Sequence, residues 1–332
     1  MHNYVFNGDA DGLCALQQLR LAGPRPAAQG GQGGQAEALI TGVKRDIALL
    51  DRVRSVAGDT CTVLDVSLDV NRAGLVALLA GGVAVRYFDH HFAGDIPAHP
   101  ALDAHIDLSP NVCTSLIVDR TLEGRFRRWA IVGAYGDSMT AEADALAREM
   151  GIAPDAAERL KALGIAINYN AYGETIEDLH VPPVELAAEM LPFADPLQFA
   201  AGSAACKRLA DGMRDDMELA KRLRPAREAP GAVVFMLPDA AWARRASGTL
   251  ANDKAKAHGG SAVAIVSPKT EGGFLVSVRV PKDFSVSAEA FCRRFPTGGG
   301  RKTAAGINHL PNEELESFTS AFEQQFRAET SA

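Results

Sequence analysis

The chain has 332 residues, of which 47% are hydrophobic, so it can bury a sizeable core in two domains or in one large one. Its formal net charge of −7 argues against binding of duplex DNA, because a long polyanion needs a positive surface. Five cysteines without a CxxC pair favour buried thiols in a reducing cytoplasm over a disulfide framework or a zinc knuckle. A polar N-terminus and the lack of a long apolar run predict a cytoplasmic protein without a membrane partner.

Short β-rich runs alternate with helical patterns in the first part of the chain. "NYVFNG" precedes "DGLCALQQLRLA", "ALITGV" precedes "RDIALLDRVRSVA", "TVLDVSL" precedes "NRAGLVALLAG", and "VAVRYFDH" comes next. Alternating strands and helices indicate βαβ units, so we expect an α/β fold with a doubly wound, mainly parallel sheet. Residues 23–36 are rich in Pro, Gly and Gln but lack the GK[ST] ending of a phosphate-binding loop, and we interpret them as a surface linker.

The second part of the chain changes pattern twice. Residues 128–228 read as nearly all helical, and after Pro230 the runs "GAVVFML", "SAVAIVS" and "GGFLVSVRV" read as strands, with helical patterns between and after them. These runs predict a smaller C-terminal α/β domain. We therefore expect one domain at 1–195, a helical connector at 196–229 and a second domain at 230–332.

Acidic and imidazole side chains cluster just after the expected strands and in one later helical segment. They are Asp9 and Asp11 in "FNGDADG", Asp65 in "VLDVS", Asp89, His90 and His91 in "YFDHH", and Asp137 in "GAYGDSM". Open parallel sheets place their chemistry beyond the carboxyl ends of the strands, where these groups could converge. Carboxylates gathered without a cation cost several kcal/mol. Together with imidazole they suit Mn²⁺ or Mg²⁺, and two such ions are the usual device for phosphoryl hydrolysis.

Each of these residues also has a simpler interpretation when it is considered alone. Asp11 could be a helix N-cap, since an aspartate often caps the helix after a strand. The histidine pair could be a hydrogen-bonded structural feature, and Asp137 could be a surface residue. The joint placement of the acidic residues at the expected strand ends favours a paired metal site.

In chain order, "FNGDADG", "VLDVS", "FDHH" and "AYGD" resemble the four motifs of the DHH phosphoesterases. "FPTGGGRKTAAGIN" resembles the glycine-rich signature of their DHHA1 companion domain, so the resemblance covers nearly the whole chain. It implies a metal-binding catalytic DHH domain at 1–195 and a substrate-binding DHHA1 domain at 230–332. Members of the family include RecJ-type single-strand exonucleases, nanoRNases that also act on adenosine 3',5'-bisphosphate, and dinucleotide phosphodiesterases.

The resemblance implies a role for each residue of the cluster. The metal ligands would be Asp9 and Asp11, each favouring a different ion, Asp65 as the bridge, His90, and Asp137 on the second ion. The implied cofactor is a pair of Mn²⁺ ions, with Mg²⁺ possible. His91 would face the substrate phosphate or the leaving group, and Asp89 would orient the histidines.

The sequence departs from the family pattern at both ends. Many members have a histidine shortly before the first aspartate, where this chain offers only Asn7 as a weaker ligand. Arg301 stands where many relatives have histidine after the glycines. Gly298, Gly299 and Gly300 would let the backbone approach a phosphate, and Arg301 would add a bidentate donor, although a flexible turn is the alternative.

Two further features before this segment are left open by the sequence. "SGTLAND" at 247–253 could cap a helix whose N-terminus faces a nucleotide, or could be plain capping. Arg244 and Arg245 could contact phosphate or could be solvated charges.

The resemblance and the composition together predict the reaction. We expect hydrolysis of phosphodiester or phosphomonoester bonds in short oligonucleotides, dinucleotides or nucleotide bisphosphates by a monomer or a homodimer. Aromatic residues make up only 6%, and no module for long single strands is evident, so RecJ-like exonuclease activity on longer strands is the alternative among enzymes. A non-catalytic nucleotide-binding regulator is the other alternative, and the GGGR segment disfavours a pyrophosphatase.

Overall fold

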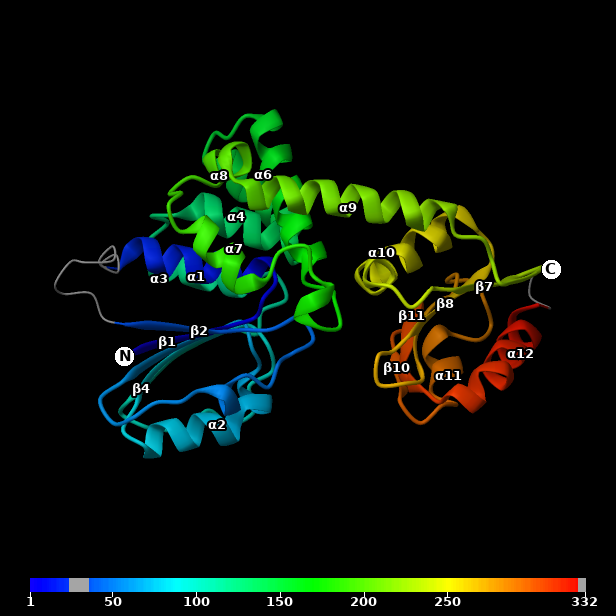
Figure 1. Ribbon diagram of the computed structural model, residues 1–332, viewed down its shortest axis with the longest axis horizontal. Coiled ribbons are helices and arrows are strands. Elements are labelled where there is room, and N and C mark those ends of the chain that lie inside the picture. Colours follow the sequence, from blue (N-terminus) through cyan, green and yellow to red (C-terminus); the bar gives the residue numbers. More distant parts are fainter. Residues whose placement is uncertain (24–35, 328–332) are drawn as a thin grey trace. The chain divides into compact units, whose positions relative to one another are not determined.

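The computed structural model describes residues 1–23 and 36–327, so the linker expected at 23–36 lies almost wholly outside the described residues. The chain divides into two compact units, Met1–Met213 and Arg214–Ala332. The division falls within helix α9 (Ala204–Arg222), in the segment expected to be a connector (Figure 1). The domain boundaries drawn from the sequence stay a prediction. Among the helices of the described residues, none is both long enough and apolar enough to span a membrane.

The first unit is built on a five-stranded sheet in the order β2-β1-β3-β4-β5. Its strands are β1 (His2–Phe6), β2 (Glu37–Ile40), β3 (Thr60–Leu64), β4 (Ala84–Asp89) and β5 (Leu102–Ile106). Every neighbouring pair is parallel, and Val63 of β3 pairs with Val5 on one side and Tyr87 on the other. Helix α1 (Ala10–Ala22) lies on one face and α2 (Leu68–Ala80) on the other (Figure 1), which confirms the doubly wound α/β fold.

Alternating side chains of the central strands bury the two faces of this sheet. Phe6, Leu64 and Phe88 join the core beneath α1, together with residues of the other helices on that side. Val63 and Tyr87 point to the opposite face and join the core beneath α2. The helices on the α1 side include α3 (Thr114–Thr121), α4 (Arg127–Gly136), α5 (Thr140–Glu149), α6 (Pro154–Asn170), α7 (Pro183–Met190) and α8 (Pro196–Gly202).

The helix expected over residues 45–57 is a wrong prediction. Only a single 3₁₀ turn forms there, η1 (Leu50–Arg52). The Asn71 side chain of α2 accepts from the Leu50 N–H (3.0 Å) and donates to the Ile47 carbonyl (2.7 Å). These bonds satisfy backbone groups that a helix would pair internally, while Leu49 and Leu50 are buried in the core. Tertiary contacts therefore override the helical periodicity of the segment.

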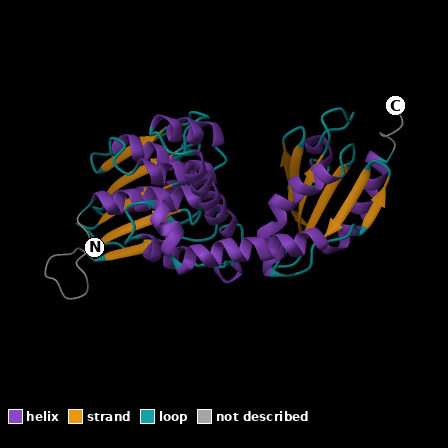
Figure 2. Ribbon diagram, turned by 90° about the horizontal axis from the view of Figure 1, so that it is seen from above, coloured by secondary structure: helices purple, strands orange, loops and turns teal. Residues whose placement is uncertain are grey.

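The second unit contains a six-stranded sheet in the order β10-β11-β9-β8-β7-β6. Its elements are β6 (Arg227–Ala229), β7 (Ala232–Met236), α10 (Ala241–Ala257), β8 (Ala262–Pro268), β9 (Phe274–Arg279), α11 (Ala288–Cys292), β10 (Gly298–Gly300), β11 (Ala304–Leu310) and α12 (Leu315–Phe326). Only β7 and β8 pair in parallel, and the other neighbours are antiparallel. Figure 2 shows helices packed against the strands in each unit, which confirms the expected smaller α/β domain.

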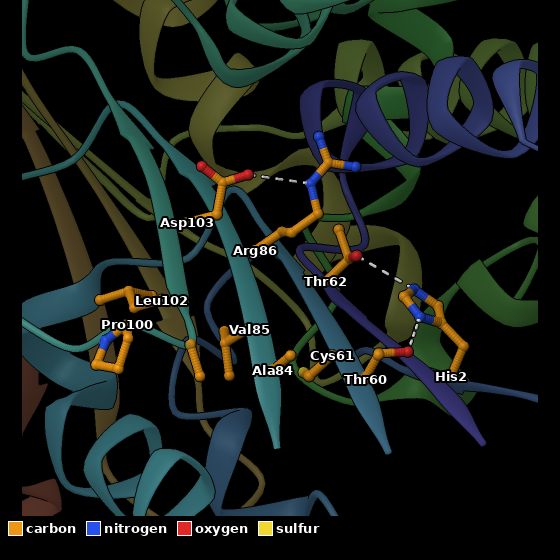
Figure 3. Close-up of a pocket in the computed structure, with 11 residues that line it drawn as sticks. His2, Thr60, Cys61, Thr62, Ala84, Val85, Arg86, Pro100, Leu102 and Asp103 are labelled. Atoms are coloured by element: carbon orange, nitrogen blue, oxygen red, sulfur yellow. Dashed lines mark hydrogen bonds and ion pairs between the residues drawn. The ribbon is translucent and has the colours of Figure 1, made fainter. Parts of the chain in front are cut away.

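A cavity of about 410 Å³ lies at the amino ends of β1, β3 and β4 (Figure 3). The His2 ring shares hydrogen bonds with the hydroxyls of Thr60 (2.6 Å) and Thr62 (3.1 Å). Arg86 Nε donates to Asp103 (3.4 Å) at its rim. The polar side chains drawn there thus pair with one another, and the predicted site residues lie at the other end of these strands.

Candidate metal centre

The carboxyl ends of β1, β3 and β4 bring four predicted carboxylates to one edge of the first sheet. Asp9 and Asp11 follow β1, Asp65 follows β3 and Asp89 ends β4. All four are almost fully buried, with at most 2% of each residue exposed. Buried carboxylates need compensation from hydrogen bonds or cations, so their partners decide what this edge can do.

The two aspartates of "FNGDADG" have different partners. Asp9, and not Asp11, is the N-cap of α1, because its Oδ1 accepts from the N–H groups of Asp11 (3.0 Å) and Gly12 (3.1 Å). The Asp11 carboxylate instead accepts from the N–H groups of Thr114 and Ser115, each at 2.7 Å. Asp11 therefore joins the start of α1 to the start of α3.

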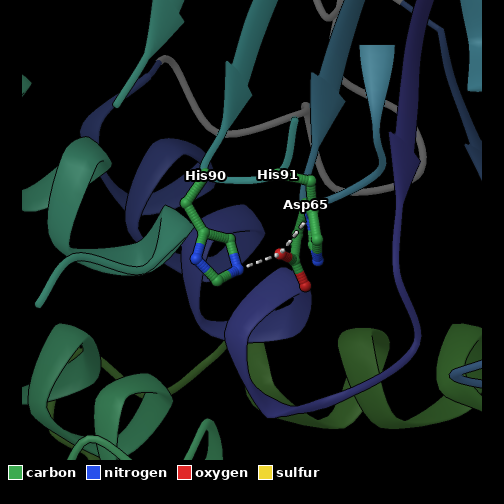
Figure 4. A group of neighbouring side chains, drawn as sticks. All are labelled: Asp65, His90 and His91. Carbon is green, nitrogen blue, oxygen red and sulfur yellow. Dashed lines mark ion pairs between the residues drawn. The ribbon is translucent and has the colours of Figure 1, made fainter. Parts of the chain in front are cut away.

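Asp65 holds its carboxylate in the site with a strained backbone. Its φ of +59° lies in the left-handed region, which aspartate tolerates better than most residues. The Thr114 hydroxyl donates to Asp65 Oδ1 (3.1 Å). His90 Nε2 (3.5 Å) and His91 Nδ1 (3.9 Å) approach the same oxygen, as Figure 4 shows. Asp65 is thus the point on which both imidazoles converge.

His90 also faces Asp137, the residue that caps the C-terminal end of α4. His90 Nε2 lies 3.8 Å from Asp137 Oδ2. Among the described residues, two groups of side chains could hold a metal ion. One group is Asp65, His90 and His91, and the other is Asp11, His90 and Asp137. His90 is common to both groups, and the predicted ligand Asp9 is in neither of them. Asp89 is also in neither group but contacts His91.

Asp89 and His91 form a pair at the end of β4. His91 Nδ1 lies 2.7 Å from Asp89 Oδ1, and this hydrogen bond raises the pKa of the imidazole despite its partial burial. Asp89 is fully buried, and its Oδ2 has no hydrogen-bond partner within the described part of the chain. The negative charge on Asp89 Oδ2 is therefore not compensated by a hydrogen bond among the described residues.

The cluster as a whole carries an excess of buried negative charge. Burial raises the pKa of the Asp65 carboxyl well above its usual range, and the nearby Asp11, Asp9 and Asp89 raise it further. Burial, followed by Asp11 and Asp9, raises the pKa of Asp137 to about 6. A divalent cation fits this donor set, because it would stabilise the ionised carboxylates that the protein alone disfavours.

Sequence reasoning missed Lys44, which belongs to the same edge of the sheet. Its Nζ donates to Asp9 Oδ2 and to the Asn168 side-chain oxygen of α6 (3.0 Å), and it lies 3.9 Å from Asp137 Oδ1. Burial raises the pKa of Asp9, but the Lys44 charge outweighs this effect and leaves that pKa below its usual range. Lys44 follows "ALITGV" as the aspartates follow their strands, so the same rule about strand ends would have found it.

Asn7, considered from the sequence as a weak metal ligand, contacts the backbone on both sides of its amide. Its oxygen accepts from the Asp9 N–H and its nitrogen donates to the Lys44 carbonyl, both at 3.3 Å. The residue is buried, with 5% exposed. These contacts hold the start of α1 against the segment that carries Lys44.

The glycine-rich segment of the second unit is a paired edge strand and not a flexible turn. Gly298–Gly300 form β10, which pairs antiparallel with β11. A Cβ on Gly298 would lie 1.7 Å from the Cys292 carbonyl, and one on Gly300 would lie 2.4 Å from Ala305 Cα. Packing within the unit therefore explains two of the glycines, while a Cβ on Gly299 would meet open space. Arg301 follows on an exposed turn, and its contact with substrate stays a prediction.

Two open interpretations in α10 are corrected by the structure. Residues 247–253 lie inside α10 and do not form its N-terminus, so they cap no helix that could face a nucleotide. Arg245 is neither a phosphate contact nor a solvated charge, because it is buried and pairs with Asp216 through Nε (2.7 Å) and Nη2 (2.8 Å). Arg244 Nη1 donates to Asp239 (2.5 Å). The helical pattern of the sequence does not reveal which side chains these arginines contact, so it could not predict their roles.

Comparison with protein-family models and with curated proteins finds no match for this chain. Solved structures do match. A manganese-bound RecJ exonuclease has a TM-score of 0.54 and 19% identity over 97% of this chain and 89% of that chain. RecJ of Thermus thermophilus in complex with Mn²⁺ has a TM-score of 0.60 and 20% identity over 97% of this chain and 51% of that chain. CDC45 of Entamoeba histolytica has a TM-score of 0.52 and 8% identity over 99% of this chain and 95% of that chain.

At identities of 20% and below, these likenesses speak of the fold. The chain spans about half the length of the Thermus protein and most of the other two. Both RecJ structures contain manganese, and the acidic edge of this chain has two groups of side chains that could hold such an ion. The chain therefore has an α/β fold like that of the RecJ structures, with a candidate metal centre at the carboxyl edge of its parallel sheet.

Proposed function

We propose that the chain is a metal-dependent phosphoesterase of the DHH/DHHA1 type. Its substrates would be short oligonucleotides, dinucleotides or nucleotide bisphosphates, hydrolysed at a phosphodiester or phosphomonoester bond. The observation that carries the proposal is the convergence of Asp11, Asp65, His90 and Asp137 at one sheet edge, with more negative charge than the chain compensates. Manganese in two structures of the same fold supports the metal dependence.

The donor set favours Mn²⁺, with Mg²⁺ as the second choice. Carboxylate oxygens suit both ions, and the imidazole of His90 shifts the preference toward a transition ion. When bound, such ions would lower the pKa of a coordinated water and neutralise charge that develops on the phosphate. The expected count of two ions stays a prediction.

The residues of the chain itself supply orientation and a proton. Asp89 accepts from His91 Nδ1, so it fixes the ring and leaves Nε2 for the substrate. The His91 side chain is 46% exposed, and its raised pKa favours the protonated form. We assign to His91 the stabilisation of the phosphate or protonation of the leaving oxygen. Asp89 positions that imidazole and does not contact the substrate itself.

The second unit would bind the distal end of the substrate. Gly299 and the exposed Arg301 are its candidate contacts, because an open backbone amide and a guanidinium suit a phosphate group. The same chemistry favours a substrate that carries a terminal phosphate or nucleotide. Gly298 and Gly300 would act indirectly, by shaping β10.

Substrate length separates the proposed function from its alternative among enzymes. An aromatic content of 6% and a net charge of −7 disfavour a long groove that stacks and neutralises a single strand. The RecJ likeness nevertheless makes exonuclease activity on longer strands the second candidate. A nucleotide-binding regulator without turnover is the third.

Product analysis by ion-exchange chromatography tests these candidates together. The full chain with Mn²⁺ is given a dinucleotide RNA, adenosine 3',5'-bisphosphate, and longer single strands of RNA and DNA in parallel. Faster turnover of the small substrates supports the proposal, and progressive shortening of the long strands selects the exonuclease. Nucleotide binding without turnover would select the regulator. Asp65→Asn is the matched inactive control, because asparagine also tolerates the left-handed backbone of Asp65.

A further inference from the structure

Lys44 places a fixed ammonium group among the carboxylates of the candidate metal centre. Its Nζ donates to Asp9 Oδ2 and to Asn168 Oδ1 (3.0 Å), and it lies 3.9 Å from Asp137 Oδ1. The Tyr172 ring lies beneath the same Nζ, with 5.7 Å to its centroid. Only 24% of the Lys44 side chain is exposed, so the ammonium is held inside the site and is not a solvated surface charge.

These contacts occupy the carboxylate of Asp9. Its Oδ1 accepts two backbone N–H groups at the start of α1, and its Oδ2 accepts from Lys44. Neither of the two groups of possible metal ligands among the described residues includes Asp9. Both groups are instead built around His90. Lys44 therefore pairs most closely with Asp9, and among the described members of these two groups it also approaches Asp137, at 3.9 Å.

We propose that Lys44 takes the place of one of the two expected divalent ions. The centre then holds a single ion on the His90 side, with ligands drawn from Asp11, Asp65, His90 and Asp137, and Lys44 is its built-in second cation. This inference rests on the proposed metal-dependent function and sharpens it. An ammonium carries one positive charge in place of two, and it stays in the site when metal is removed.

The remaining N–H donor of Lys44 gives the ammonium a second role, as a contact to the substrate. An ammonium has three N–H donors, and two of them serve Asp9 and Asn168. The third is available for a phosphate oxygen of the substrate. Lys44 would thus supply the charge neutralisation at the phosphate that a second ion supplies elsewhere.

Counting bound Mn²⁺ tests the inference without any turnover. The full chain, freed of metal by dialysis, is titrated with MnCl₂ by calorimetry, and the bound ion is examined by electron paramagnetic resonance. One ion per chain with the spectrum of an isolated Mn²⁺ is the expected result. Two ions per chain with the spectrum of an exchange-coupled pair would overturn the inference, even if the protein hydrolyses its substrate rapidly.

The variant Lys44→Met then tests whether Lys44 is the reason that the chain binds one Mn²⁺ ion and not two. Removal of the ammonium frees Asp9 Oδ2, so the variant is expected to bind a second Mn²⁺ and to show the coupled spectrum. A count of one in both proteins would mean that lysine replaces no ion. Arg45→Met is the matched control, because it removes a positive charge from the neighbouring exposed position and should leave the count at one.

The wild-type count remains decisive if Lys44→Met fails to fold, which circular dichroism would reveal. The two proposals also fail in different ways. One bound ion without hydrolysis of any substrate would support the inference that Lys44 replaces a metal ion, and it would reject the proposed function. Two bound ions with rapid hydrolysis would reject the inference about Lys44 and support the proposed function.

Discussion

Buried charge is handled in opposite ways in the two units of this protein. In the second unit Asp216 and Arg245 are both buried and meet through two hydrogen bonds of 2.7 and 2.8 Å. In the first unit several carboxylates crowd the carboxyl edge of the parallel sheet, and Lys44 is the one lysine that the structure places among them within residues 1–23 and 36–327. The buried pair of the second unit has one negative and one positive charge, whereas the carboxylates of the first unit outnumber the single lysine beside them.

The difference separates a structural role from a functional one. A matched bidentate pair repays much of its desolvation through its own hydrogen bonds and needs no further partner. Burial, and then the neighbouring carboxylates, raise the pKa of Asp65 and Asp137, and Asp89 Oδ2 has no hydrogen-bond partner among the described residues. Such a cluster is costly for the folded protein alone, which is typical of a site completed by a ligand.

Asp65→Asn is expected to have the largest effect on the unmatched cluster. Loss of the carboxylate on which both imidazoles converge should reduce Mn²⁺-dependent hydrolysis by more than the roughly 10–100-fold seen for residues that only support metal ligands. The same change should raise the melting temperature of the metal-free protein, because it removes a carboxyl whose charge is disfavoured by burial and then by Asp11 and Asp9. Kinetic assays and thermal unfolding in EDTA measure the two effects. Retained activity with a lower melting temperature would contradict this account.

Arg245→Met tests the matched pair in the second unit. Removal of the guanidinium takes two hydrogen bonds and an opposite charge from the buried Asp216, so we expect a loss of about 3–5 kcal/mol in the free energy of unfolding. The double variant with Asp216→Leu should recover most of it, since an apolar pair of similar size needs no compensation. Urea unfolding measures both variants. The number of bound Mn²⁺ ions should not change, and a change would show that this pair is coupled to the metal centre.

Asp89→Asn should have a smaller effect, because Asp89 acts through His91. Asparagine keeps an oxygen for His91 Nδ1 but removes the negative charge that raises the pKa of the imidazole. We expect a loss of about 10–100-fold in activity, mainly in kcat, and a lower pKa for His91 in an NMR titration. An unchanged pKa with lower activity would point to a merely structural role for Asp89.

The pH dependence of stability should be the smallest effect and should change sign with metal. The pKa of Asp137 is raised from 3.8 to about 6, so the folded state binds this proton more tightly than the unfolded state does. In the metal-free protein the contribution of Asp137 to stability is therefore expected to be lost as the pH rises from about 4 to 6, which the difference from Asp137→Asn isolates. With Mn²⁺ the trend should reverse, because the ion binds the ionised carboxylates. Melting temperatures across this range, with Asp137→Asn as a flatter control, measure the slope.

Local patterns in the sequence were sufficient for the sheet and for the acidic edge. Strands and helices alternate visibly before Asp89, and this alternation predicts parallel strands whose carboxyl ends share one edge. Asp9, Asp65 and Asp89 each closely follow or end such a strand, so their approach to one another follows from the period of the pattern. Which residue stands at the carboxyl end of a strand is local information, and the sequence carries it.

Partners that are distant in the chain were decided only by the tertiary structure. Lys44 reaches Asp9 because β2 lies beside β1, which is a matter of strand order and not of local pattern. Asn71 binds backbone groups of residues 45–57 and so replaces the hydrogen bonds of the helix expected there. Arg245 was a candidate phosphate contact, but its pairing with Asp216 makes it a structural residue. Periodicity reveals which face of an element is apolar. The state of a buried charge depends on which opposite charges the fold brings within a few ångströms, and that is set by packing between elements.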